Sequence, residues 1–283
     1  MSKPRLILVD GSGYIFRAYY ALPPMNNSKG IPTNAVYGFC NMMLRLIEEH
    51  PNDKILIILD AGRNTFRNTL FPEYKANRGE APEDLIPQFS IIREAIDAFG
   101  LDVIEKKDFE ADDVIASYVK YGEDNNIPTT VFSSDKDLFQ LLSTNNRIMD
   151  PMKNIEIDEA KVMEKFGVGP DKITDVQALI GDSVDNIPGV PGIGPKTASK
   201  LINDFGTFED LLANKEKISN ERIKNLIHDH EEKAKISHQL VILKNDLELP
   251  ITIEKLKDFE DSTKLNDFFK KYEFKSVSYT HLR

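Results

Sequence analysis

Four short apolar runs rich in β-branched residues lie in the first half of the chain, at 5–9, 54–59, 101–104 and 129–132. Each is typical of a strand that is buried on both faces. Apolar residues recur with helical spacing between these runs, over 34–48 behind Thr33 as the expected N-cap, over 83–98 and over 111–121. Alternating strands and helices predict an α/β domain, a mostly parallel sheet flanked by helices, over about residues 1–166.

The pattern changes at residue 167, from strands to helices and tight turns. A helix is expected over 171–180, followed by the stretch IPGVPGIGPKTASKLINDFG at 187–206 and then by several charged helices. This predicts a second, helical region over 167–278. The chain closes with SYTHLR, which resembles translated sequencing adapter, so residues 279–283 are expected to be a non-native tail.

Carboxylates gather where the predicted strands end. RLILV runs into Asp10, KILIIL runs into Asp60, and the strand at 129–132 leads into SSDKD. Other acids open the helix at 111–121 or lie in IGDSVDNIPG. Because the carboxyl ends of parallel strands meet at one edge of a sheet, these side chains are expected to converge. Taken singly, each acid is more simply a helix cap or a partner of the helix dipole. The set is Asp10, Asp60, Glu110, Asp112, Asp113, Asp135, Asp137, Asp182 and Asp185.

Such a cluster predicts bound cations. Two carboxylates about 5 Å apart repel by roughly 3 kcal/mol at an effective dielectric of about 20. Oxygen ligands without histidine or cysteine favour Mg²⁺ or Mn²⁺ over zinc. Two or more such ions would activate a water and stabilise the leaving oxygen during attack on a phosphodiester.

The overall charge changes meaning in this light. The net charge of -10 argues by itself against a nucleic-acid partner. Setting aside the nine clustered carboxylates leaves a charge of -1, which removes the objection.

The single cysteine, Cys40, lies among apolar residues and is expected in the core. No apolar run approaches the roughly 18 residues of a membrane span, so a cytoplasmic protein is expected.

The segment FRNTLFPEYKANRGE at 66–80 combines cations with an aromatic ring. It offers Arg67, Tyr74, Lys75 and Arg78. If the segment is helical, Tyr74 and Arg78 share one face, with Lys75 beside them. A ring next to cations suits an unpaired nucleotide, although an ordinary solvated helix explains the segment equally well.

The stretch GVPGIGPKTA at 189–198 fails as a phosphate loop, because a proline interrupts the GK[ST] pattern. A helix-hairpin-helix near 187–206 fits better, since its backbone N–H groups and the next helix N-terminus can hold a phosphate without reading sequence. A purely structural turn is the alternative. The candidate contacts are Gly189, Gly192, Gly194, Lys196, Thr197 and Lys200.

Five motifs occur in the order of those of the bacterial 5' nuclease family, and most resemble the N-terminal 5'-3' exonuclease domains of DNA polymerases I. They are VDGSGYIFRAYYALP, LDAGRNTFRNTLFPEYKANR, EADDVIAS, SSDKDLFQLL and GDSVDNIPGVPGIGPKTA. The resemblance implies a PIN-like core followed by a helix-3-turn-helix motif. It also implies a 5'-3' exonuclease and flap endonuclease that uses two-metal catalysis on branched, flapped or nicked duplex DNA, including RNA primers, in Okazaki fragment processing and excision repair. A monomer that continues into a polymerase region is expected.

The resemblance also implies roles for residues. Asp10, Asp60, Glu110, Asp112 and Asp113 would serve a first metal and Asp135, Asp137, Asp182 and Asp185 a second. Asp113, one turn beyond Glu110, is the expected direct ligand. Lys75 and Arg78 would steer the scissile phosphate, Tyr74 would stack on the terminal base, and Arg17 and Arg67 would contact DNA. Residues 71–85 would form a helical arch, and the glycine hairpin would hold K⁺.

Two other classes of function were weighed against a nuclease. A catalytically inactive DNA-junction binding module would use the carboxylates to hold ions structurally. A phosphatase with an aspartyl nucleophile needs a second aspartate two residues after Asp10, where this chain has Ser12. The family pattern also differs at Gly62, Arg63 and Ser134, but the acidic set is complete, so an active enzyme is expected.

Overall fold

A six-stranded sheet in the order β3-β2-β1-β4-β5-β6 organises the first part of the protein. The structure is a computed structural model that describes residues 4–259 and 263–274. Neighbouring strands are parallel except β5 and β6, which are antiparallel. The mostly parallel sheet predicted from the sequence is confirmed. The strands are β1 Leu6–Asp10, β2 Lys54–Leu59, β3 Asp102–Glu105, β4 Thr129–Phe132, β5 Asn146–Asp150 and β6 Ile155–Ile157.

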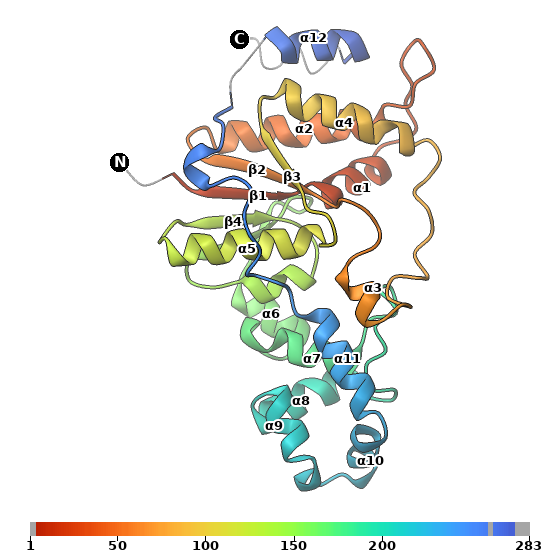
Figure 1. Cartoon of the computed structure of the whole chain (residues 1–283). Helices are drawn as coiled ribbons and strands as arrows, with labels where there is room; N and C mark the ends of the chain where they lie inside the picture. Colours follow the sequence, from red (N-terminus) through yellow and green to blue (C-terminus); the bar gives the residue numbers. More distant parts are fainter. Residues whose placement is uncertain (1–3, 260–262, 275–283) are drawn as a thin grey trace.

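Helices cover both faces of the sheet (Figure 1). Successive side chains of a strand point to opposite faces, so Leu6 and Leu8 of β1 join the core under α5, whereas Ile7 and Val9 join the core under α2 and α4. All four are fully buried. The helices on the Ile7 face are α1 Gly11–Ala21, α2 Asn34–Glu49, α4 Ile86–Ala98 and α12 Thr263–Tyr272, and on the Leu6 face lies α5 Ala111–Asp124.

The helical region extends from the α5 side of the sheet, and its apolar side chains continue the same core. α7 and α11 pack on each other, and His238 Nε2 of α11 lies 3.0 Å from Asp175 Oδ1 of α7. After α11 the chain returns along α5, where Tyr118 donates to the Ile251 carbonyl at 2.7 Å. The helices are α6 Glu159–Phe166, α7 Ile173–Ile180, α8 Pro195–Phe205, α9 Phe208–Ala213, α10 Glu221–Asp229 and α11 Glu231–Val241, with short 3-10 turns η2 Pro170–Lys172, η3 Lys215–Lys217 and η4 Ile253–Lys255.

The expected strands and helices are present, with ends displaced by a few residues. Thr33 stands at the N-cap of α2 but makes no side-chain cap. The sequence patterns missed α1, β5 and β6. Cys40 is buried, as expected. No helix in the described part of the chain is long and apolar enough to cross a bilayer. The predicted tail at 279–283 lies outside the described residues.

Residues 71–85 correct one prediction, because they do not form a helical arch. The short helix α3, Phe66–Leu70, ends at Phe71, and the chain continues in turns and irregular backbone. Lys75 has a positive φ of 56°, which is incompatible with a continuous right-handed helix. Tyr74 and Arg78 are therefore not one helical turn apart.

Candidate active site

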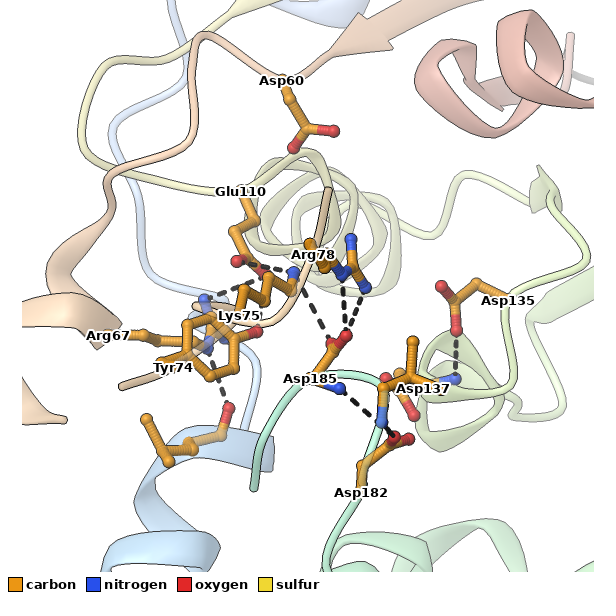
Figure 2. A network of polar contacts seen from close by, with 12 residues as sticks. Asp60, Arg67, Tyr74, Lys75, Arg78, Glu110, Asp135, Asp137, Asp182 and Asp185 are labelled. Carbon is orange, nitrogen blue, oxygen red and sulfur yellow. Dashed lines mark hydrogen bonds and ion pairs between the residues drawn. The ribbon is translucent and has the colours of Figure 1, made fainter. Parts of the chain in front are cut away.

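A cavity of about 190 Å³ opens at the carboxyl edge of the parallel strands, and seven of the nine predicted carboxylates line it. Arg67, Lys75 and Arg78 also line it, and Figure 2 shows these basic side chains among the acids. The convergence expected from the strand ends is therefore present in the structure. The seven are Asp10, Asp60, Glu110, Asp112, Asp135, Asp137 and Asp185.

Hydrogen bonds hold the carboxylates at the ends of β1 and β2. Asp10 ends β1 and caps α1, accepting the Gly13 N–H at 2.8 Å through Oδ1. Its Oδ2 accepts the Ser133 hydroxyl at 2.7 Å. Asp60, directly after β2, accepts the Ala111 N–H at 2.9 Å. Asp60 thereby ties the N-terminus of α5 to the sheet edge.

Burial and mutual repulsion raise the pKa of three of these acids. Burial, with the negative charges of Asp135 and Asp60, raises the pKa of Asp10 to about 6. Burial and then Asp135 raise the pKa of Asp137 to about 6. Burial and the same neighbour hold the pKa of Asp112 well above its usual range. Carboxylates that resist ionisation beside one another, with only oxygen ligands among them, fit a site for hard divalent cations.

The 3-10 turn η1, Asp137–Leu141, presents Asp137 to the cavity. The Asp137 N–H donates to Asp135 Oδ1 at 2.9 Å. Gln177 of α7 donates from Nε2 to Asp137 Oδ1, while its buried Oε1 has no hydrogen-bond partner. The sequence patterns missed Gln177, since nothing in its spacing marks a helical glutamine as a neighbour of a strand-end acid.

A tight hairpin carries Asp182 and Asp185. Asp182 and Ile187 exchange two backbone hydrogen bonds of 2.9 and 2.7 Å, which close the loop. Asp185 faces the cavity, whereas Asp182 does not line it. Asp182 accepts the Lys136 ammonium at 2.5 Å. Although burial alone would raise the pKa of Asp182, that hydrogen bond holds it below its ordinary value.

The basic residues meet the acids from the segment after α3 (Figure 2). Lys75 Nζ lies 2.8 Å from Glu110 Oε1 and 3.7 Å from Asp185 Oδ2. Arg78 donates to Asp185 Oδ1 through Nε at 3.0 Å and also through Nη2. Tyr74 is only 4% exposed and its hydroxyl donates to Glu110 at 3.2 Å. Tyr74 lines the cavity, but with 4% of its surface exposed and Lys75 Nζ 5.0 Å from the ring centroid it offers little area for the expected base stacking.

Asp113 and Arg67 depart from their expected roles. Asp113 is fully buried and does not line the cavity, while its neighbour Asp112 does. Arg67 is 1% exposed and binds Asp113 with two hydrogen bonds of 2.7 and 2.8 Å. The expectation that Asp113 is the direct ligand is wrong for this structure, because α5 turns that side chain toward Arg67. Arg67 also lines the cavity, but its guanidinium is 1% exposed and bound to Asp113, which leaves it little surface for a contact with the DNA backbone.

The glycine-rich stretch forms a hairpin between α7 and α8. Gly189 is buried and its N–H donates to Ser237 Oγ at 2.9 Å, so its predicted phosphate contact is not possible here. The other predicted contacts are accessible: Gly192, Gly194, Lys196 and Lys200 are exposed and Thr197 is half-buried. Arg17, in α1, is also exposed and donates to Ser134 Oγ at 2.7 Å.

Comparisons with known proteins agree with this fold and site. The family model for the 5'-3' exonuclease N-terminal resolvase-like domain matches residues 5–167, and the model for the 5'-3' exonuclease C-terminal SAM fold matches residues 168–264. The fold and the site thus define a nuclease, and the chain belongs to the 5'-3' exonuclease family. The family resemblance and fold class expected from the sequence are confirmed.

Individual relatives place the chain within that family. It is 38% identical over 273 residues to the 5'-3' exonuclease of Aquifex aeolicus, covering 96% of this chain and 93% of that protein. It is 44% identical over 282 residues to DNA polymerase I of Rhizobium leguminosarum, covering 96% of this chain but only 28% of that protein. The chain thus spans about a third or less of its polymerase I relatives.

A solved structure shares the fold. A bacteriophage T5 flap endonuclease, described as a pseudo-enzyme-product complex with DNA and metal ions, aligns with a TM-score of 0.71 at 23% identity. The alignment covers 95% of this chain and 98% of the phage protein. At this identity the similarity establishes the architecture.

Proposed function

We propose that the protein is a metal-dependent 5'-3' exonuclease and flap endonuclease that hydrolyses phosphodiesters in branched, flapped or nicked duplex DNA with a 5' end. The observation that carries this proposal is the convergence of seven carboxylates and three basic side chains, Arg67, Lys75 and Arg78, on one cavity. A carboxylate cluster opposite fixed positive charges suits a phosphate held between metal ions and basic side chains.

The carboxylates divide into two ligand sets for Mg²⁺ or Mn²⁺. When bound, such ions would generate a hydroxide nucleophile and screen the charge that builds up on the phosphate. The first set is carried by the ends of β1 and β2 and the start of α5, and the second by the segment from β4 to η1 and by the hairpin. The first comprises Asp10, Asp60, Glu110 and Asp112, and the second Asp135, Asp137 and Asp185, with Asp182 placed to act through water.

Lys75 and Arg78 act as electrostatic partners of the reacting phosphate. Burial alone would lower the pKa of Lys75, but the adjacent Glu110 holds it above its ordinary value, so the ammonium stays charged at neutral pH. In this structure Lys75 pairs with Glu110, and Arg78 pairs with Asp185. Metal ions on these carboxylates would leave Lys75 and Arg78 free to contact a phosphate.

The 5' end of the substrate passes through a second, larger cavity of about 980 Å³ beside the first. It is bounded by the irregular segment after α3 and by aromatic and basic side chains that suit an unpaired strand. On the other side, the hairpin at Gly192 and Gly194 holds the duplex backbone, together with K⁺. Such backbone contacts position DNA without reading its sequence. The larger cavity is lined in part by Tyr20, Arg63, Phe89 and Arg93.

The similarity to DNA polymerases I also supports a proposal for the biological setting. We propose that the chain is the N-terminal part of a cytoplasmic DNA polymerase I, monomeric, and that it removes RNA primers and displaced 5' strands in Okazaki fragment processing and excision repair. The similarity to DNA polymerase I of Rhizobium leguminosarum over 96% of this chain supports this proposal.

The test is cleavage of a 5'-labelled flap substrate with Mg²⁺, with products mapped at nucleotide resolution. Asp112→Asn removes a cavity carboxylate and is expected to abolish cleavage. The matched control is Asp124→Asn at the exposed end of the same helix, where the aspartate pairs with Lys120, and it is expected to cleave normally. Equal cleavage by both variants would refute the proposed site.

The assay also separates the alternative function. Tight flap binding by the wild type without turnover in Mg²⁺ or Mn²⁺ would identify a DNA-junction binding module instead of a nuclease.

A further inference from the structure

The most enclosed polar contact beside the active site is the ion pair of Arg67 and Asp113. Arg67 Nη1 and Nη2 donate to the two carboxylate oxygens at 2.7 and 2.8 Å. The side chains are 1% and 0% exposed. Paired hydrogen bonds of this kind fix the orientation of both planar groups, and only arginine can form them.

Arg67 also donates to backbone carbonyls at the C-terminal end of α11. Nε donates to the Leu240 carbonyl at 2.8 Å, and Nη2 donates to the Ile242 carbonyl at 3.1 Å. These carbonyls lie at the C-terminal end of α11, which has no further helical N–H groups to offer them. Arg67 thus joins α3 to α11, and its Nε and both Nη atoms are occupied within the protein.

Asp113 completes the connection on the α5 side. Its Oδ1 accepts the Lys244 N–H at 2.9 Å and its Oδ2 accepts the Glu110 N–H at 3.2 Å. The latter bond fixes the backbone of the first turn of α5, which carries Glu110 and Asp112. The pair therefore contacts three segments at once: α3, which leads to Lys75 and Arg78, the acidic end of α5, and the end of α11.

We infer that Arg67 and Asp113 are positioning residues, which set the relative placement of the cavity carboxylates on α5 and the cations that follow α3. The inference rests on the proposed nuclease function and replaces the roles of DNA contact and metal ligand for these two residues. In this role the pair acts through Glu110, Asp112, Lys75 and Arg78. Arg67 reaches the cavity wall, where Nη1 lies 3.7 Å from Glu110 Oε2, and thereby supports that carboxylate.

The physical reason is the sensitivity of catalysis to placement. A displacement of about 1 Å in an active site can cost roughly 100-fold in rate. Lysine in place of Arg67 keeps a positive charge but loses the paired geometry and the contacts to the α11 carbonyls. The α3 segment can then shift relative to α5 without an unpaired buried charge.

The test compares Arg67→Lys with the exposed Arg45→Lys of α2, which serves as the control. Arg67→Lys is expected to lower kcat for flap cleavage at least tenfold, while flap affinity in EDTA and its dependence on salt stay within twofold of wild type. Arg45→Lys is expected to match wild type throughout. Weaker binding with a shallower salt dependence in Arg67→Lys would show a lost phosphate contact and overturn the inference.

A double-mutant cycle separates positioning from metal ligation. Arg67→Met, Asp113→Leu and the double variant are expected to lose similar amounts of kcat, because each breaks the same pair. The double variant is expected to unfold at a higher temperature than either single variant, since neither buried charge is then left alone. A much larger loss for Asp113→Leu than for Arg67→Met would assign Asp113 as a ligand and refute the inference.

One readout does not depend on cleavage. The rise in unfolding temperature on adding Mg²⁺ is expected to be smaller for Arg67→Lys than for wild type, because the carboxylates are less well arranged. An equal rise in both would contradict the inference. Failure of the wild type to cleave any flap would instead overturn the proposed function. The rise in unfolding temperature with Mg²⁺ would then still test whether Arg67 and Asp113 position the carboxylates.

Discussion

Gly181 offers a sharp test of how the hairpin places its acids. It has φ 73° and ψ -176°, a region that is essentially restricted to glycine. A Cβ at this position would lie 2.5 Å from the Ile187 carbonyl oxygen and 2.8 Å from the Gly189 nitrogen. Both are backbone atoms, which cannot move aside without opening the hairpin.

The expected cost of Gly181→Ala has two parts. The backbone conformation costs about 1–3 kcal/mol for a residue with a Cβ. Weakening the two hydrogen bonds between Asp182 and Ile187 adds about 1 kcal/mol each. We therefore expect a loss of about 3–5 kcal/mol in the free energy of unfolding, and each 1 kcal/mol corresponds to about 2–4 °C in unfolding temperature.

Urea and thermal unfolding followed by circular dichroism measure this loss, and flap cleavage reports the displacement of Asp185. Gly62→Ala is the control, because a Cβ at Gly62 meets no atom within 4 Å and its φ is not positive. We expect Gly62→Ala to unfold within about 0.5 kcal/mol of wild type. If Gly181→Ala were equally stable, the argument from backbone geometry would be wrong.

Three further predictions concern the cavity. Burial and then Asp135 raise the pKa of Asp112, so the ionised carboxylate destabilises the folded state. In EDTA at pH 7.5, Asp112→Asn is therefore expected to unfold at a higher temperature than wild type. This difference in unfolding temperature should shrink as the pH falls toward 5, and a difference independent of pH would contradict the reasoning. Gln177→Leu removes a hydrogen bond to the Asp137 carboxylate that is worth about 1.5–3 kcal/mol. The Mg²⁺ concentration that gives half-maximal cleavage is therefore expected to rise roughly tenfold to a hundredfold. An unchanged concentration would count against a positioning role for Gln177. Lys75→Met is expected to lower kcat roughly 100- to 1000-fold with an unchanged circular dichroism spectrum, and a kcat near that of wild type would exclude Lys75 from catalysis.

Much of the site was predictable because the residue that ends a parallel strand can be assigned from its neighbours in the sequence. A parallel strand that ends in an aspartate delivers it to a known edge of the sheet, so Asp10 and Asp60 were assigned from the residues that precede them. The glycine hairpin was predictable for a similar reason, since its backbone geometry demands glycine at fixed positions. Strand ends and tight turns therefore determined where the carboxylates would meet.

The tertiary structure decided which of two adjacent acids enters the cavity. Successive residues of a helix point about 100° apart, so Asp112 and Asp113 cannot face the same way, and only the packing of α5 against Arg67 selects between them. The same holds for Gln177, whose role depends on α7 reaching Asp137 across the chain. By itself the sequence determined the strands β1 to β4, the acids that follow them and the family. The direction of each side chain came from contacts between segments far apart in the chain, because packing free energy, which no local pattern encodes, selects among the orientations that the backbone allows.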